Sequence, residues 1–256
     1  MYSPIRPLKS LGQHFLNSPE FANQIAGALR DDGTYKNVLE IGPGTGVLTE
    51  LLLQNPKINL YCIEIDERSV AYLEERFPEL RGKILFEDFL HSPLTQFGDE
   101  PFAVIGNFPY NISSQILFRV LDFYKRVPEL VGMFQMEVAK RIASGPGSKE
   151  YGILSVLLQA HYQIEYLFTV PPEVFIPQPK VQSGVLRMKL RSDPSLKCDP
   201  VLFKRIVKTG FNQRRKTLRN SIKSLIPPGR ENVPYLDKRP EQLHYSQFEE
   251  LARILI

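Results

Sequence analysis

The chain has 256 residues, of which 43% are hydrophobic and 23% charged, enough for one large domain or one domain with a small appendage. No apolar run reaches the roughly 18 residues that a membrane span needs, and residues 1–6 hold no signal-peptide core, so we expect a cytoplasmic protein. The net charge of +4 divides into −5 over residues 1–186 (16 basic, 21 acidic) and +9 over residues 187–256 (16 basic, 7 acidic), which predicts a basic module for a polyanion.

Short apolar runs alternate with helical patterns in the first part of the chain, which predicts a parallel sheet covered by helices. The expected strands span residues 38–41, 60–65, 83–86, 102–106 and 131–135, and the expected helices lie over residues 114–123 and around residues 153–158. Residues 164–170 and 183–190 are strand-like and are joined by a proline-rich stretch. We expect them to form an antiparallel hairpin at the sheet edge, since proline is excluded from central strands.

A domain boundary is expected at residues 192–195, whose sequence is Ser-Asp-Pro-Ser. Asp199 and Pro200 then provide a helix N-cap and a proline at the first helical position. Leu218, Ile222 and Leu225 continue a helical face. We therefore predict two domains, residues 1–191 and a small helical domain over residues 192–256.

A glycine-rich turn follows the first expected strand. Gly42, Gly44 and Gly46 stand where glycine lets the backbone turn sharply and approach a ligand closely. Glu64 ends the next strand, and a carboxylate there can accept hydrogen bonds from both ribose hydroxyls of an adenosine ligand. These features alone fit either a dinucleotide or S-adenosylmethionine.

The glycine spacing distinguishes the two ligands. Dinucleotide sites have G-x-G-x-x-G facing a pyrophosphate, whereas this chain has G-x-G-x-G with Glu40 two residues upstream, as in S-adenosylmethionine methyltransferases. Asp88, after the third strand, is expected to accept a hydrogen bond from the cofactor adenine. We predict an α/β fold: a Rossmann-like methyltransferase domain with a seven-stranded, mostly parallel sheet and an antiparallel edge hairpin, plus a small C-terminal helical domain.

Asn107-Phe108-Pro109-Tyr110 follows the fourth expected strand. The exocyclic amine of adenine is a poor nucleophile, because its lone pair is delocalised into the ring. The Asn107 oxygen and a backbone carbonyl can accept its two N–H bonds, while Pro109 fixes the backbone and Tyr110 stacks on the extruded base. No metal is expected, since the four histidines lack metal-ligand spacing. A strand-ending turn is the alternative interpretation of this tetrapeptide alone.

Several segments resemble the ribosomal RNA adenine dimethyltransferase family, in particular its small-subunit members. Residues 11–16 resemble the family's L-G-Q-N/H-F-L, and residues 107–111 resemble N-L-P-Y-N with Phe108 in place of leucine. Residues 170–183 are similar to V-P-P-x-x-F-x-P-x-P-K-V-x-S, and residues 211–218 match F-x-x-R-R-K-x-L. The resemblance covers nearly the whole chain.

The resemblance implies further site residues and a substrate. Phe175 would face Tyr110 across the target adenine. The implied cofactor contacts are His14, Leu16, Gly42, Glu64, Asp88 and Asn107, beside Glu40, Gly44 and Gly46 of the glycine-rich turn. The expected RNA contacts are Arg214, Arg215, Lys216, Arg219 and Lys223. The implied reaction is dimethylation, by a monomer, of N6 on two adjacent adenosines in the 3′-terminal hairpin of 16S rRNA within the small subunit or its precursor, with a role in subunit biogenesis.

Other functions stay open at this point. A 23S rRNA adenine N6-methylase conferring macrolide resistance shares the cofactor pattern, although the basic tail and the proline-rich segment favour the small-subunit enzyme. A DNA adenine N6-methyltransferase would use a similar tetrapeptide. A non-catalytic ribosome assembly factor would keep the fold without the reaction. The presence of Asn107 and Tyr110 argues against this alternative. The basic tail alone also fits a solvated surface.

Overall fold

The computed structural model describes residues 5–30, 32–230 and 232–255, so the outer ends of the two predicted domains lie outside the described residues. The strands are β1 (Phe15–Leu16), β2 (Asn37–Ile41), β3 (Asn59–Glu64), β4 (Ile84–Phe86), β5 (Phe102–Asn107), β6 (Glu129–Gln135), β7 (Tyr162–Val170), β8 (Phe175–Ile176) and β9 (Ser183–Leu190). The α-helices are α1 (Pro19–Ala26), α2 (Val47–Leu53), α3 (Glu67–Arg76), α4 (Ser113–Asp122), α5 (Met136–Ala143), α6 (Ile153–His161), α7 (Pro200–Asn212), α8 (Leu218–Ser221) and α9 (Tyr245–Ile254).

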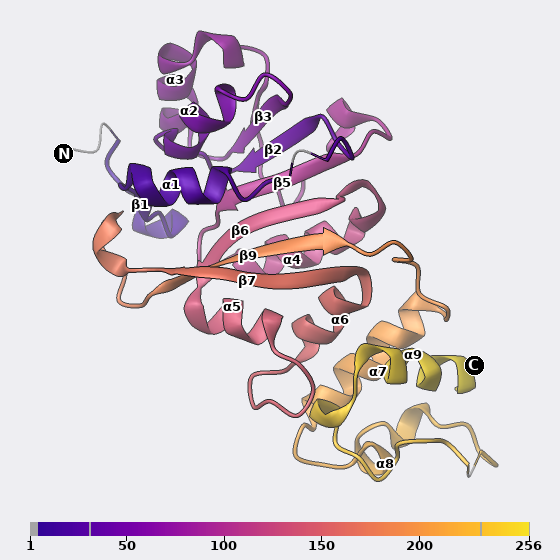
Figure 1. The fold of residues 1–256 in the computed structure, drawn as a ribbon. Coiled ribbons are helices and arrows are strands. Elements are labelled where there is room, and N and C mark those ends of the chain that lie inside the picture. Colours follow the sequence, from indigo (N-terminus) through magenta and orange to yellow (C-terminus); the bar gives the residue numbers. More distant parts are fainter. Residues whose placement is uncertain (1–4, 31, 231, 256) are drawn as a thin grey trace. The chain divides into compact units, whose positions relative to one another are not determined.

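The main sheet has the strand order β4-β3-β2-β5-β6-β9-β7 (Figure 1). β2 pairs in parallel with both β3 and β5, and β4 and β6 extend the parallel part on either side. β9 runs antiparallel to β6, with Glu129 opposite Lys189. The predicted seven-stranded, mostly parallel sheet with an antiparallel edge is thus confirmed.

Alternate residues of the central strands face different layers, because side chains along a strand point to opposite faces. Val38, Cys62 and Ile105 pack in one hydrophobic cluster with residues of α1, α2 and α3. Figure 1 shows α1 and α2 on one face of the sheet and α4 on the other. This layering leaves the carboxyl ends of the parallel strands free to carry a site.

A two-stranded sheet that the sequence did not predict joins distant parts of the chain. β1 pairs antiparallel with β8, so that Leu16 lies opposite Phe175. β8 belongs to the proline-rich stretch between β7 and β9. The pair therefore ties the N-terminal segment to the segment that precedes β9.

The chain forms two compact units. One holds the described residues up to Ala139 together with Glu165–Leu190, and the other holds Lys140–Ile164 together with the described residues from Arg191 onward. Residues around α6 belong to the second unit because α6 packs against α7 and α9. The predicted boundary between two domains at residues 191 and 192 remains a prediction.

The second unit is helical. Asp199 caps α7 by accepting a hydrogen bond from the Leu202 amide at 2.6 Å, as its sequence predicts. The continuous helical face expected through Leu225 is wrong: α8 ends at Ser221, and Ile222 (φ −107°, ψ 14°) leaves the helical conformation before a 3-10 turn. Two prolines at 227 and 228 follow, where a longer helix would have to end.

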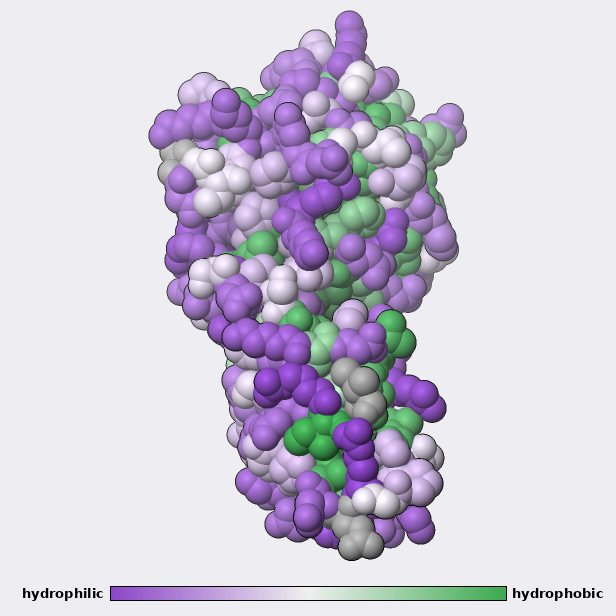
Figure 2. Space-filling view, turned by 90° about the vertical axis from the view of Figure 1, so that its right-hand side faces the viewer, coloured by the Kyte–Doolittle hydropathy of each residue, from purple (hydrophilic) through white to green (hydrophobic). Residues whose placement is uncertain are grey.

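The surfaces of both units carry mostly hydrophilic residues on the face drawn in Figure 2, with hydrophobic residues confined to small areas. Across the described ranges, no helix has the length and apolar character needed to cross a membrane.

Candidate active site

The loop after β2 makes the predicted sharp turn. Gly42, Gly44 and Gly46 have φ values of 66°, 57° and 79°, which side-chain-bearing residues rarely adopt. A Cβ on Gly44 would lie 2.8 Å from the Phe15 ring, and one on Gly46 would lie 2.6 Å from the Phe77 ring. Gly42 and Gly44 line a pocket at the strand ends, whereas Gly46 does not line it and instead allows close packing beside α3. A cofactor contact of Gly46 remains a prediction.

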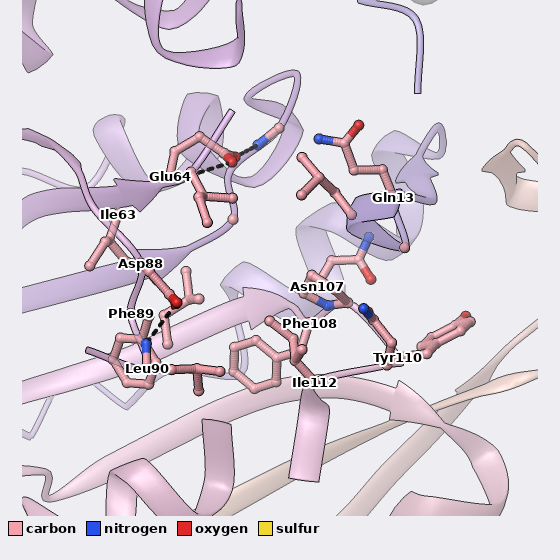
Figure 3. A pocket seen from close by; sticks show the side chains of 18 of the residues that line it. Gln13, Ile63, Glu64, Asp88, Phe89, Leu90, Asn107, Phe108, Tyr110 and Ile112 are labelled. Atoms are coloured by element: carbon pink, nitrogen blue, oxygen red, sulfur yellow. Dashed lines mark hydrogen bonds between the residues drawn. The ribbon is translucent and has the colours of Figure 1, made fainter. Parts of the chain in front are cut away.

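Acidic side chains at neighbouring strand ends line the same pocket. Glu64, the last residue of β3, accepts hydrogen bonds from the backbone N–H groups of Gly44 (3.3 Å), Ile65 (2.8 Å) and Asp66 (2.9 Å). Burial raises the pKa of Glu64, and these three N–H groups act in the opposite direction. Figure 3 shows Glu64 and Asp88 on one side of the pocket and the residues that follow β5 on the other.

Glu40 lies outside this pocket. Its side chain is 1% exposed and points between β2 and α2, where it accepts a hydrogen bond from the Thr49 hydroxyl at 2.7 Å. The Cys62 thiol lies 3.9 Å from the same oxygen. Burial raises the pKa of Glu40 to about 7, the Thr49 hydrogen bond lowers it, and the charge of Glu64 raises it further. Glu40 therefore joins the strand to the helix behind the glycine loop, and its contact with a cofactor remains a prediction.

Asn107 is the last residue of β5, and its side chain reaches the pocket. The side-chain Nδ2 donates a hydrogen bond to the His14 carbonyl at 2.8 Å. Within the described part of the chain, its Oδ1 has no hydrogen-bond partner and is open to a ligand. Pro109 also lines the pocket, and its carbonyl accepts a hydrogen bond from the Ile112 amide at 3.2 Å as the chain turns into α4.

Tyr110 is held on two sides. Its hydroxyl lies 2.6 Å from the Ser183 hydroxyl, and its ring stacks on the His14 imidazole with centroids 5.4 Å apart and planes 26° apart. Burial raises the pKa of the Tyr110 phenol, which therefore stays neutral. Ser183 was not among the predicted site residues, although it closes the proline-rich motif, and that position is the sequence signal that could have identified it.

Leu16 and Phe175 are both buried, with 5% and 3% of their surface exposed, and both belong to the hydrophobic cluster beneath the helices. Neither side chain lines the pocket that holds Asn107. Leu16 lines a second cavity beside α1 and α2. Their predicted contacts with cofactor and target base remain predictions.

Phe108, which replaces the leucine of the family motif, is a packing residue. It is 1% exposed and meets Phe134 edge to face, with ring centroids 5.2 Å apart. A Cβ on Gly132 would lie 2.4 Å from the Phe108 ring, so this glycine makes room for the larger side chain.

The predicted RNA-contacting residues all lie in the second unit, after α7. Arg215, Lys216, Arg219 and Lys223 are exposed. Arg214 is only partly exposed, because it donates a hydrogen bond to the Ser148 carbonyl at 3.1 Å and pairs with Glu241 at 3.9 Å. Arg214 therefore also holds this unit together, while the four exposed side chains remain open to a polyanion.

Comparisons with known proteins show the family to which the chain belongs. A family model described as ribosomal RNA adenine dimethylase matches residues 6–256. The ribosomal RNA small subunit methyltransferase A of Cytophaga hutchinsonii is 51% identical over 252 residues, which covers 98% of each chain. A dimethyladenosine transferase from Plasmodium falciparum has a similar crystal structure, with a TM-score of 0.79 at 24% identity over 93% of this chain and 96% of that chain. The 23S rRNA methyltransferase ErmE matches with a TM-score of 0.67 at 26% identity, over 93% of this chain and 99% of that chain. The chain therefore belongs to the ribosomal RNA adenine dimethylase family.

Proposed function

We propose that this protein transfers methyl groups from S-adenosylmethionine to N6 of two adjacent adenosines in the 3′-terminal hairpin of 16S rRNA, giving N6,N6-dimethyladenosine. Family membership and the 51% identity to a small-subunit methyltransferase over 98% of the chain support this substrate. We place the reaction in the cytoplasm and in small-subunit biogenesis, with the protein acting as a monomer.

The pocket suits S-adenosylmethionine because of its shape and its donor set. Gly42 and Gly44 line the pocket without side chains, so a ligand can approach their backbone closely. Glu64 would accept hydrogen bonds from the ribose hydroxyls, and Asp88 from the adenine amino group. When bound, the cofactor supplies an electrophilic methyl group on a sulfonium.

The hydrogen bonding of Asn107 is the single observation that carries the proposal. Because Nδ2 donates a hydrogen bond to the His14 carbonyl, the Asn107 amide cannot rotate by half a turn without losing that bond. Oδ1 is therefore left as an acceptor facing the pocket. An acceptor at this place can bind an N–H of adenine and direct the nitrogen lone pair. Such alignment can lower a barrier by about 7–11 kcal/mol. The Tyr110 ring adds a flat surface for the base.

The basic segment after α7 supports an RNA substrate. Between Lys204 and Lys223 there are eight basic residues and no acidic ones. Phosphate contacts from such side chains position a protein on RNA and make its affinity depend on salt. We assign Arg215, Lys216, Arg219 and Lys223 to this role.

The test compares Asn107→Ala with the wild-type protein in two assays, methylation of immature small subunits and binding to them. We expect Asn107→Ala to lose methylation and keep binding. Asn107→Asp keeps an acceptor oxygen but has no N–H for the His14 carbonyl, so it should also be severely impaired. Asn23→Ala, on the exposed surface of α1, is the matched control and should keep both properties. Full methylation by Asn107→Ala would refute the active-site assignment.

A further inference from the structure

We propose that the segment Leu8–His14, named here the strap, closes over the pocket and positions Asn107, and that Gln13 and Asp66 are the positioning residues that hold it closed. The proposal rests on the proposed function, because it takes Asn107 as the residue that binds the target amine. It concerns how that residue acquires its orientation.

The strap has a defined internal structure. A 3-10 turn over Lys9–Leu11 leads into Gly12, whose φ of 63° reverses the chain and whose amide donates to the Lys9 carbonyl at 3.1 Å. The Leu8 amide donates to Oε1 of Gln13 at 2.8 Å, which closes the loop on itself. Residues from Ser10 to His14 line the pocket, so the strap forms part of its wall.

The side chain of Gln13 fixes the strap to Asp66. Nε2 of Gln13 donates to Oδ2 of Asp66 at 3.0 Å. The Asp66 side chain is 4% exposed and also accepts hydrogen bonds from Arg68, at 2.6 Å from Nη2 and 2.9 Å from Nε. The Arg68 hydrogen bonds lower the pKa of Asp66, so the carboxylate stays ionised and can only accept. This requirement fixes which way the Gln13 amide points.

The residues on either side of Gln13 contact the residues that follow β5. The His14 carbonyl accepts the Asn107 Nδ2 hydrogen bond, and the His14 ring stacks on Tyr110. A Cβ on Gly12 would lie only 2.4 Å from Oδ1 of Asn111, so the strap backbone lies directly against this turn. Figure 3 shows Gln13 on the same side of the pocket as Asn107 and Tyr110, opposite Asp88.

The contact with Asp66 and the contact with Asn107 are coupled because Gln13 and His14 are neighbours. Holding the Gln13 side chain at Asp66 restrains the peptide group whose carbonyl orients Asn107. The amide of Asp66 is in turn held by Glu64, which lines the pocket. When the strap opens, the His14 carbonyl leaves and the Asn107 amide is free to rotate. Asn107 therefore has its working orientation only while the pocket is closed.

The test exchanges donor and acceptor between the two positioning residues. Gln13→Glu keeps the acceptor for the Leu8 amide but places a second carboxylate against Asp66. Asp66→Asn alone keeps an acceptor for Gln13 and serves as the control. In the double variant Gln13→Glu/Asp66→Asn, the amide NH2 group takes the place of Oδ2 and can donate to the carboxylate at position 13, which restores the hydrogen bond with reversed polarity. The amide oxygen at position 66 keeps the bonds from the Arg68 amide and Nε, and only the bond from Arg68 Nη2 is given up.

Three properties of each variant are measured. For Gln13→Glu we expect about tenfold faster hydrogen exchange of residues 8–16, about tenfold weaker binding of S-adenosylmethionine by calorimetry, and about tenfold lower kcat at saturating substrates. The double variant should return all three to within about twofold of wild type. The double variant also keeps the test decisive if Gln13→Glu lowers the thermal midpoint.

Unchanged exchange and cofactor affinity in Gln13→Glu would overturn the proposal, as would a folded double variant that fails to recover. A loss of thermal stability with kcat unchanged would mean that the contact is only structural and would also overturn it. The exchange and calorimetry measurements need no RNA. Failure of the proposed function, seen as no dimethyladenosine with wild-type protein, is therefore distinguishable from failure of this inference.

Discussion

Replacing Glu40 with glutamine is expected to change how the stability of the protein depends on pH. The carboxyl group is wholly buried between β2 and α2, and burial raises its pKa from 4.5 to about 7. Between these two values the folded protein holds a proton that the unfolded chain releases. The free energy of unfolding of the wild-type protein therefore falls as the pH rises from 4.5 to about 7 through this group.

The size of the effect follows from the two pKa values. One pH unit corresponds to roughly 1.4 kcal/mol, so the difference amounts to about 3 kcal/mol. Glutamine has no proton to lose in this range, and Glu40→Gln should not show this contribution. Its extra N–H groups can lower stability at every pH by a similar amount, so the informative quantity is the change in the difference between the two proteins across the pH range.

Urea denaturation between pH 5 and pH 8 measures this difference. The wild-type protein should lose up to about 3 kcal/mol relative to Glu40→Gln over that range. Thr49→Val is a useful companion, because the Thr49 hydrogen bond lowers the pKa of Glu40 and its removal should move the loss to higher pH. Parallel pH profiles for the wild-type protein and Glu40→Gln would show that Glu40 does not titrate with a raised pKa in the folded protein.

Three further predictions concern packing, base stacking and RNA binding. Gly132→Ala should destabilise the fold by about 1–3 kcal/mol in urea unfolding, because its Cβ would lie 2.4 Å from Phe108, and adding Phe108→Leu should recover most of the loss; no recovery would count against the packing assignment. Tyr110→Phe keeps the ring stacked on the strap, so its kcat should fall less than that of Tyr110→Ala, and equal losses would argue against a stacking role. Replacing both Arg215 and Lys216 with alanine should weaken binding to small subunits and reduce the slope of log affinity against log salt by up to about 2, and an unchanged slope would exclude phosphate contacts.

The parallel strands could be predicted because each contains a run of apolar residues between polar turns. The strand expected at residues 60–65 is β3 (Asn59–Glu64), and the strand expected at residues 83–86 is β4 (Ile84–Phe86). β1 and β8 were not predicted, because strands of two residues are too short to show a periodic pattern. Their pairing also joins positions about 160 residues apart in the chain.

The convergence of Glu64, Asp88 and the Asn107 turn on one pocket was predictable for a general reason. Parallel strands present their carboxyl ends at one edge of a sheet, so residues that end successive strands meet there. The same strand geometry explains Glu40: side chains alternate along β2, and this one faces α2 rather than the pocket. The motif alone does not show which face of the strand each of its residues occupies.

The contacts of the strap could not be predicted from the sequence. Gln13 and Asp66 are 53 residues apart, and His14 and Asn107 are 93 residues apart. Neither pair follows a helical or strand period, and a glutamine near a surface turn has many other possible partners. Only the folded chain brings the strap onto the turn after β5 and thereby gives Asn107 its orientation.

The most direct test of the proposed function supplies labelled S-adenosylmethionine to the wild-type protein with immature small subunits, mature small subunits or naked 23S rRNA, followed by nucleoside mass spectrometry. We expect N6,N6-dimethyladenosine in 16S rRNA of the small-subunit particles, at two adjacent adenosines of the 3′-terminal hairpin. Dimethyladenosine found only in 23S rRNA, or methylation at a position other than adenine N6, would contradict the proposed function.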